Sequence, residues 1–446
     1  MSLKRGIFYT FLTQAPTLLF YFVSSTLMTR ILGDEGRGAF ALLQNQVVLI
    51  TMLFSFSIGF GITYFVSKEQ GDPRRMVRVS ATLLTMNLLL VPLIVSAIYF
   101  IPALQSIFMP EEVDHWGYYV YVVISVIGTQ VTGFIGAIML GLKRFRILNQ
   151  AGMLNAGLSA IAFLILYTIS ESIDQERILA SVVMVSLSYG LIMLLVWCII
   201  YIKVVGILPT PVWDWSILRP VFLFVMTTHL GNIINLLNYR FDVWVVGSYA
   251  GSAQLGLYAV AVGVGQLCFY IPEPFSKVVQ PYLYGQTGHA MLEKFKFIQR
   301  LNFTTVFVLL LCMAIVAPWV FPLLFGEVFA DSVAPLWWLL PGILFVSASK
   351  LLGPLVVQGG FIRFNLYAAG LAASTTILLG LLLIPHWGII GAAFVSSVAY
   401  IVQFAVQCAI VRFRMKITLK DMFFLQSTDF VRIRALIGNR LPFLSK

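Results

Sequence analysis

Two lysines lie inside segments that are otherwise apolar, where charged side chains are rare. Lys277 and Lys350 fall roughly 10 Å and roughly 15 Å from the inner ends of the helices predicted around them. A charge inside a bilayer costs roughly 2.5–3.5 kcal/mol on insertion scales, so each lysine is a candidate for function. Because ammonium groups attract anions as point charges, we expect the pair to bind an anionic group. For Lys277 there are alternatives: neutralisation by Glu273 one turn earlier, or extension toward the interface.

A second set of polar residues lies on the predicted helix 217–238. His229, Asn232 and Asn235 recur at every third position, so they share one stripe of that helix. Either these side chains hydrogen-bond to neighbouring helices, or they recognise a polar ligand in a cavity.

Four further charged residues are expected at the outer mouth of the helices. We expect Arg240 and Asp242 either to pair directly or to lock the outward gate, and Glu273, inside the predicted helix 256–284, is a further gating candidate. Arg30 and Arg37 are expected either to meet acidic outer loops or to bind an anion there.

The composition shows what kind of chain must position these residues. Of 446 residues, 60% are hydrophobic and 11% are charged, whereas a soluble domain carries about 25% charged residues. Apolar runs long enough to cross a bilayer recur along the chain, so we predict an all-α integral membrane protein.

The charge and the reactive residues exclude several functions. The net charge of +11 is not gathered on one soluble face, which argues against nucleic-acid binding. The four cysteines lack zinc or redox spacing, and no nucleophile triad is visible. We therefore predict no enzyme, no metal and no cofactor.

The apolar segments predict about twelve transmembrane helices. With the N-terminus inside, roughly 25 of the 29 basic residues fall on the inner side, as cytoplasmic loops require. Both termini are therefore expected in the cytoplasm, with the basic tail against membrane lipids. The predicted helices are 7–28, 42–66, 77–101, 117–141, 149–169, 179–202, 217–238, 256–284, 301–325, 334–358, 365–385 and 389–411.

The two halves of the chain resemble each other at an offset of 218 residues. GDEGRGAFA, from Gly33 to Ala41, stands against GSAQLGLYA, from Gly251 to Ala259, and each opens an even-numbered helix. Matched halves frame a central cavity in many transporters. We therefore predict two six-helix bundles around a central cavity. The predicted boundaries are 1–205 for the first bundle, 206–220 for a cytoplasmic connecting loop, 217–411 for the second bundle and 412–446 for a basic cytoplasmic tail.

Two segments of the sequence resemble a known family. TRILGDEGRGAFAL, from Thr29 to Leu42, resembles the first-loop signature of Wzx-type polysaccharide and O-antigen flippases of the multidrug/oligosaccharidyl-lipid/polysaccharide superfamily. RFDVWVVG, from Arg240 to Gly247, is similar to the family's seventh-to-eighth helix region. The resemblance implies a multi-pass protein of the bacterial cytoplasmic (inner) membrane. It would move undecaprenyl-diphosphate-linked oligosaccharide to the outer leaflet by alternating access, for surface polysaccharide synthesis.

The resemblance also suggests roles for the candidate residues. The two lysines and the two mouth arginines would bind the diphosphate, and the polar stripe at His229 would bind the sugar. A polysaccharide polymerase is an expected partner, and H⁺ or Na⁺ is the coupling ion to consider. The sequence specifies neither the ion nor the sugar.

Two other functions compete with the flippase. A cation-coupled multidrug exporter uses the same scaffold, but the intramembrane charges here are two lysines against one glutamate. A membrane-embedded glycosyltransferase or polymerase needs large outer loops, and the predicted ones are mostly under about 15 residues. Flippases of the peptidoglycan precursor usually have fourteen helices in this family, so twelve argue against that cargo.

Overall fold

The protein consists of helices in the part of the chain that its computed structural model describes. That part comprises residues 3–68, 73–102, 104–105, 115–142, 144–206, 210–213, 215–270 and 289–430, and no strand occurs in it. The α-helices are α1 (Leu3–Phe54), α2 (Ile58–Lys68), α3 (Pro73–Phe100), α5 (His115–Gly141), α6 (Phe145–Ile169), α7 (Gln175–Val205), α8 (Trp215–Gln266), α10 (His289–Phe325), α11 (Val333–Gln358), α12 (Ile362–Phe413) and α13 (Lys420–Phe423). Short 3₁₀ helices lie at Ser170–Ser172, Leu267–Tyr270 and Glu327–Ser332.

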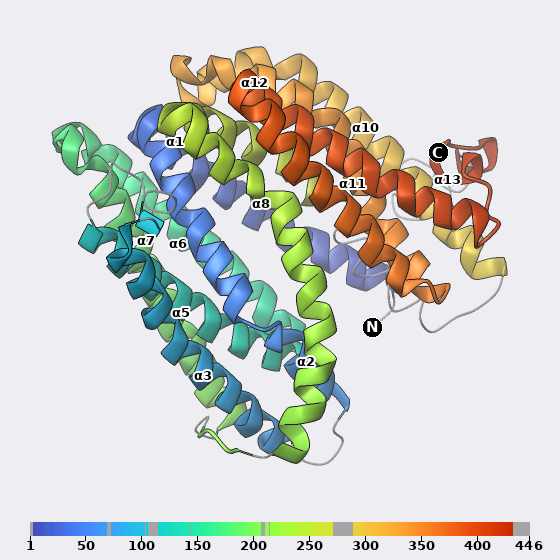
Figure 1. The fold of residues 1–446 in the computed structure, drawn as a ribbon, viewed down its shortest axis with the longest axis horizontal. Helices are drawn as coiled ribbons and strands as arrows, with labels where there is room; N and C mark the ends of the chain where they lie inside the picture. The colour runs from blue at the N-terminus through green and yellow to red at the C-terminus, as the bar shows by residue number, and fades with distance from the viewer. Residues whose placement is uncertain are drawn as a thin grey trace, which may run out of the picture.

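Three of these helices, α1, α8 and α12, are divided by a glycine. Gly33, Gly251 and Gly388 have φ angles of 64°, 80° and 56°, in the left-handed region that glycine adopts at no steric cost. Each glycine therefore ends one helical arm and begins another, and the chain turns back between the arms (Figure 1).

Eight helices in the described residues are long and apolar enough to cross a membrane. This confirms the prediction of an all-α, multi-pass membrane protein. The number differs from the predicted twelve partly because each of the three divided helices counts once although it contains two arms. A further apolar stretch, Leu84–Phe100 of α3, is shorter than the eight.

The hydrophobic core divides largely between the halves, although Phe22 and Leu42 of α1 pack against a cluster of the second half and Val225 of α8 belongs to a cluster of the first. Two of the four core clusters take their buried residues from positions 28–225, and the other two take theirs from positions 243–423. In Figure 1 the helices α3, α5, α6 and α7 lie on one side and α10, α11 and α12 on the other, with α1 and α8 between them. The surfaces along which α1 and α8 meet therefore connect the halves.

The segment that joins the halves is shorter than the predicted loop 206–220. Gly206, with φ of 69°, ends α7, and α8 already begins at Trp215. Between them Val212 is tied to α3, because its backbone N–H donates to Thr82 Oγ1 over 2.9 Å and its carbonyl accepts from that hydroxyl over 2.8 Å.

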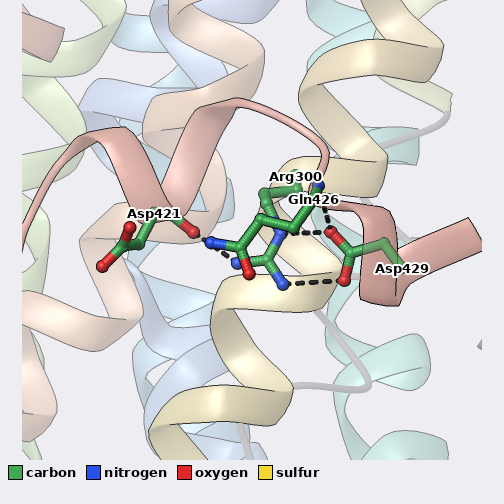
Figure 2. A network of polar contacts seen from close by, with 4 residues as sticks. All are labelled: Arg300, Asp421, Gln426 and Asp429. Carbon is green, nitrogen blue, oxygen red and sulfur yellow. Dashed lines mark hydrogen bonds and ion pairs between the residues drawn. The ribbon is translucent and has the colours of Figure 1, made fainter.

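The first part of the predicted basic tail folds onto the protein rather than serving only as a lipid anchor. Met422 and Phe423 are buried in the core cluster that contains residues of α10, α11 and α12. Nearby, the Arg300 guanidinium of α10 donates to both carboxylate oxygens of Asp429, over 2.6 and 2.8 Å (Figure 2). Arg300 also donates to the Asp421 carbonyl, and Asp429 accepts from the Gln426 backbone N–H over 2.9 Å. No pattern in the sequence predicts this buried ion pair.

Candidate functional site

The repeated glycines bring the two halves into backbone contact. A Cβ built on Gly38 would lie 2.9 Å from the Gly256 nitrogen and closer still to the Ser252 carbonyl. A Cβ built on Gly256 would lie 3.1 Å from the Gly38 nitrogen and closer still to the Asp34 carbonyl. Asp34 and Ser252 are separated by the same 218 residues as the two glycines, so the contact is reciprocal. We call these four residues the glycine seam; only residues without a Cβ allow helices to approach this closely.

Arg30 makes a second connection between the halves near the seam. Its guanidinium donates to the carbonyl of Leu324 over 2.6 Å and to that of Leu323, at the C-terminal end of α10. The last carbonyls of a helix have no partner within the helix and carry partial negative charge, so an arginine stabilises them. Arg30 was expected either to meet acidic outer loops or to bind an anion. In the structure it binds the end of a helix instead.

We predict that Arg30→Met will weaken this end of the molecule. Two hydrogen bonds from a charged donor are lost, which should raise the population of molecules opened at the seam by roughly tenfold. The measurement is the labelling rate of a cysteine placed at Ser25, in a background without the native cysteines, by a membrane-impermeant maleimide added on the seam side. Arg30→Lys should be intermediate because it keeps the charge but not the fork of donors. Unchanged labelling in Arg30→Met would contradict this role.

Arg37 lies in a cavity between the halves, which we call the Arg37 cavity. This cavity of about 220 Å³ is lined by Tyr21 and Ser25 of α1, by Gln266 of α8 and by Phe325 of α10, among others. The Arg37 side chain is only 8% exposed, and its Nε and Nη1 have no hydrogen-bond partner among the described residues. A buried charge is costly unless something pairs with it. The arrangement therefore places a buried guanidinium, whose charge lacks a partner among the described residues, at the edge of a cavity that an anion could enter.

A larger cavity, which we call the N-terminal cavity, lies mainly among helices of the first half. Its volume is about 640 Å³, and its polar lining comes from α1, α5, α6 and α7, with one residue of α8, Arg240. The polar side chains are Gln44, Tyr121, Ser125, Thr129, Thr132, Asn155, Ser186, Tyr189, Trp197 and Arg240. Arg240 is the one charged side chain of this lining among the described residues, so the structure places it on the wall of a cavity.

Asp242, two residues from Arg240, belongs to a different set of contacts. Its carboxylate accepts from the Tyr258 hydroxyl, from Ser396 Oγ over 3.2 Å and from the Val243 backbone N–H over 2.9 Å. Within the described residues no ion pair joins Asp242 to Arg240, so the expected direct pair does not form. Their gating role stays a prediction.

His229 and Asn232 form a hydrogen-bonded set with Ser57, where the helix of the first half is interrupted. Phe56 and Ser57 have φ angles of 44° and 51° between α1 and α2. Ser57 Oγ lies 3.3 Å from His229 Nδ1 and accepts from Asn232 Nδ2 over 2.9 Å. Two members of the predicted polar stripe thus make interhelical hydrogen bonds. Asn235, the third, is half-buried on α8.

Of the two lysines predicted inside the membrane, Lys350 belongs to the described residues and Lys277 does not. Lys350 is half-buried on α11, and its Nζ lies 4.0 Å from the centre of the Phe269 ring, a cation–π geometry. Its anion-binding role stays a prediction. Lys277 and Glu273 lie outside the described residues.

Several residues of the site were not singled out from the sequence. The Tyr21 hydroxyl, on the wall of the Arg37 cavity, accepts a hydrogen bond over 2.8 Å from Asn155 Nδ2, on the wall of the N-terminal cavity. The walls of the two cavities therefore touch at this hydrogen-bonded pair of side chains. Hydroxyl and amide residues are common in membrane helices, so no spacing distinguished these.

Comparisons with known proteins agree with this architecture. Residues 3–284 match a family model described as polysaccharide biosynthesis protein. No curated protein sequence matches the chain.

Solved structures resemble the chain at low sequence identity. The lipid II flippase MurJ, in an inward closed conformation, is 15% identical with a TM-score of 0.69, over 98% of this chain and 96% of that one. An inward-facing multidrug resistance MATE family transporter of the MOP superfamily is also 15% identical with a TM-score of 0.69, over 90% of this chain and 96% of that one. A MOP superfamily transporter from Pyrococcus furiosus is 14% identical with a TM-score of 0.54, over 94% and 98%. At these identities the likeness concerns the fold.

Proposed function

Because this chain belongs to the polysaccharide biosynthesis protein family, we propose that it moves a saccharide linked to a lipid diphosphate from the inner to the outer leaflet of a bacterial cytoplasmic membrane. The family and the structural neighbours indicate a transporter and not an enzyme. The cargo we propose is undecaprenyl-diphosphate-linked oligosaccharide, for surface polysaccharide such as O-antigen or exopolysaccharide.

One observation carries this proposal: a buried arginine with unused donors lies between the halves. Arg37 faces a cavity bounded by α1, α8 and α10, elements of both halves. A phosphate anion would satisfy the guanidinium through short charge-assisted hydrogen bonds. Since the charge is costly without such a partner, the cavity suits the diphosphate of the cargo better than a cationic drug.

The mechanism we propose is alternating access around this cavity. The distribution of basic residues supports twelve crossings with both termini in the cytoplasm, which assigns the glycine seam to the outer side. In the present conformation the seam brings the halves together, so the outward path is closed. Opening it would require the halves to separate at Gly38 and Gly256, while Arg30 releases the end of α10.

A cation-coupled multidrug exporter is the second candidate, and one observation favours it. Asp242 is a buried carboxylate held by hydroxyl groups, and such a group suits a coupling ion, H⁺ or Na⁺. One structural neighbour is a MATE transporter in complex with Rb⁺. An ion at Asp242 is equally compatible with driving the flippase.

Substituting Arg37 tests the proposed function. Arg37→Gln should lower flipping of a fluorescent lipid-diphosphate oligosaccharide in proteoliposomes by roughly 10- to 100-fold, because hydrogen bonds to a charged group are worth about 1.5–3 kcal/mol. Arg37→Lys should keep part of the activity. Arg144→Gln is the matched control, because Arg144 is exposed and lines neither the Arg37 cavity nor the N-terminal cavity.

The outcomes separate the two candidates. Unimpaired flipping in Arg37→Gln, with normal amounts of protein in the membrane, would remove Arg37 from the site. Wild-type protein that extrudes cationic dyes but leaves the lipid-linked saccharide in place would favour the exporter.

A further inference from the structure

The N-terminal cavity has a lining that suits a sugar. It combines hydroxyl groups, such as Ser125, Thr129 and Ser186, with the amides of Gln44 and Asn155. Hydroxyls and amides both donate and accept, as a saccharide requires on all sides. Its volume of about 640 Å³ lies within the usual range for small-molecule sites, about 300–1,000 Å³.

The aromatic part of the lining fits the same ligand class. Tyr121, Tyr189 and Trp197 lie on the cavity wall, and such rings offer an apolar face together with a polar edge. Among the described residues, the lining contains no carboxylate, and its one charged group is the Arg240 guanidinium. This positive charge opposes the binding of a cationic drug in the cavity.

The position of the cavity relative to Arg37 is the decisive observation. Tyr21 lines the Arg37 cavity, Asn155 lines the N-terminal cavity, and their side chains share a hydrogen bond of 2.8 Å. In the proposed cargo the first sugar is bonded directly to the diphosphate. A diphosphate in the Arg37 cavity and a sugar in the N-terminal cavity would therefore lie on the two sides of the Tyr21–Asn155 pair.

We infer that the N-terminal cavity is the chamber that binds the saccharide of the cargo, with Tyr21 and Asn155 at its entrance. This inference rests on the proposed function and adds a separate site for the sugar. Arg240, from the second half, completes a wall otherwise built by the first half. A sugar that contacts Arg240 would therefore touch both halves at once, and release from the chamber requires their separation.

Protection of an introduced cysteine tests the chamber without transport. Thr129 is exposed to the cavity on α5, so Thr129→Cys, in a background without the native cysteines, should react with a water-soluble maleimide. The first probe is the repeat-unit oligosaccharide released from the host's surface polysaccharide, which has sugar but no diphosphate. The second is geranyl diphosphate, which has diphosphate but no sugar. The matched control is Ser188→Cys, because Ser188 is exposed on α7 but does not line the cavity.

The expected result is protection by the sugar alone. Millimolar oligosaccharide should slow labelling of Thr129→Cys by roughly tenfold and leave Ser188→Cys unchanged, while geranyl diphosphate should change neither. Absence of protection by the oligosaccharide, or protection by geranyl diphosphate alone, would overturn the inference.

A cavity-filling variant provides the second measurement. Thr129→Trp should lower flipping of the lipid-linked oligosaccharide by roughly tenfold or more while geranyl diphosphate still binds, and Ser188→Trp should do neither. Normal flipping in Thr129→Trp would overturn the chamber and leave the proposed function standing. Geranyl diphosphate binding in Arg37→Gln, by contrast, tests only whether Arg37 binds the diphosphate, as the proposed function requires. Its loss in this variant says nothing about the chamber.

Discussion

Replacing Gly38 or Gly256 by alanine will lower transport by roughly 5- to 150-fold, the effect of about 1–3 kcal/mol of overpacking in the conformation closed at the seam. The new methyl group would collide with the backbone of the opposite half, at Ser252 or Asp34. Backbone cannot move aside as the end of a flexible side chain can. The double variant should be at least as impaired as either single variant, because both methyl groups oppose the same closure.

A control substitution at a glycine without close neighbours separates the collision at the seam from the general effect of replacing a helical glycine by alanine. Gly231 lies on α8, like Gly256, but a Cβ built there meets nothing within 4 Å. Gly231→Ala should therefore transport normally. Labelling of a cysteine at Ser25 from the seam side should rise in Gly38→Ala and Gly256→Ala and stay low in Gly231→Ala. If the seam variants keep wild-type transport and labelling, the seam is not a moving contact.

Removing either partner of the Arg300–Asp429 pair will destabilise the second half by about 3–5 kcal/mol, because the remaining charge stays buried without its counterpart. The two side chains are 2% and 0% exposed, and they join α10 to the tail (Figure 2). The measurement is thermal unfolding of purified Arg300→Met and Asp429→Leu in detergent. The double variant Arg300→Met/Asp429→Leu should recover much of the loss, since it leaves no unpaired charge.

The chain offers a control for this pair as well. Arg177 and Asp174 also approach each other, at 3.9 Å, but their side chains are 79% and 81% exposed. Because water screens such a pair, Arg177→Met should leave the unfolding temperature nearly unchanged. A double variant no more stable than the single ones would show that packing of the tail, rather than its charge, holds it in place.

The parts of the structure that follow from local chain properties could be predicted from the sequence. Apolar length predicted membrane helices, and the repeated glycines at 33 and 251 predicted where the chain turns in each half. Both have the positive φ that glycine adopts at no steric cost. The contact between Gly38 and Gly256 is a property of two helices together, and the repeat alone did not predict it.

The candidate site was predicted less well because its contacts join distant residues. Arg30 was expected to bind an anion, but helix-terminal carbonyls have no sequence signature, so its hydrogen bonds to Leu323 and Leu324 could not be anticipated. Arg300 and Asp429 are separated by 129 residues, and no sequence pattern links a single carboxylate in a basic tail to a distant arginine. Arg37 was expected either to meet acidic outer loops or to bind an anion, and its Nε and Nη1 are buried without a hydrogen-bond partner among the described residues.

The buried pair between α10 and the tail has a practical consequence for mapping how the chain is threaded through the bilayer. Topology is often measured with reporter enzymes attached to successively shortened chains. Every fusion point between residues 300 and 429 would leave the Arg300 guanidinium without the carboxylate that compensates it. Such hybrids should be degraded or misinserted for reasons unrelated to topology, so reporters inserted into the full-length chain are the better choice.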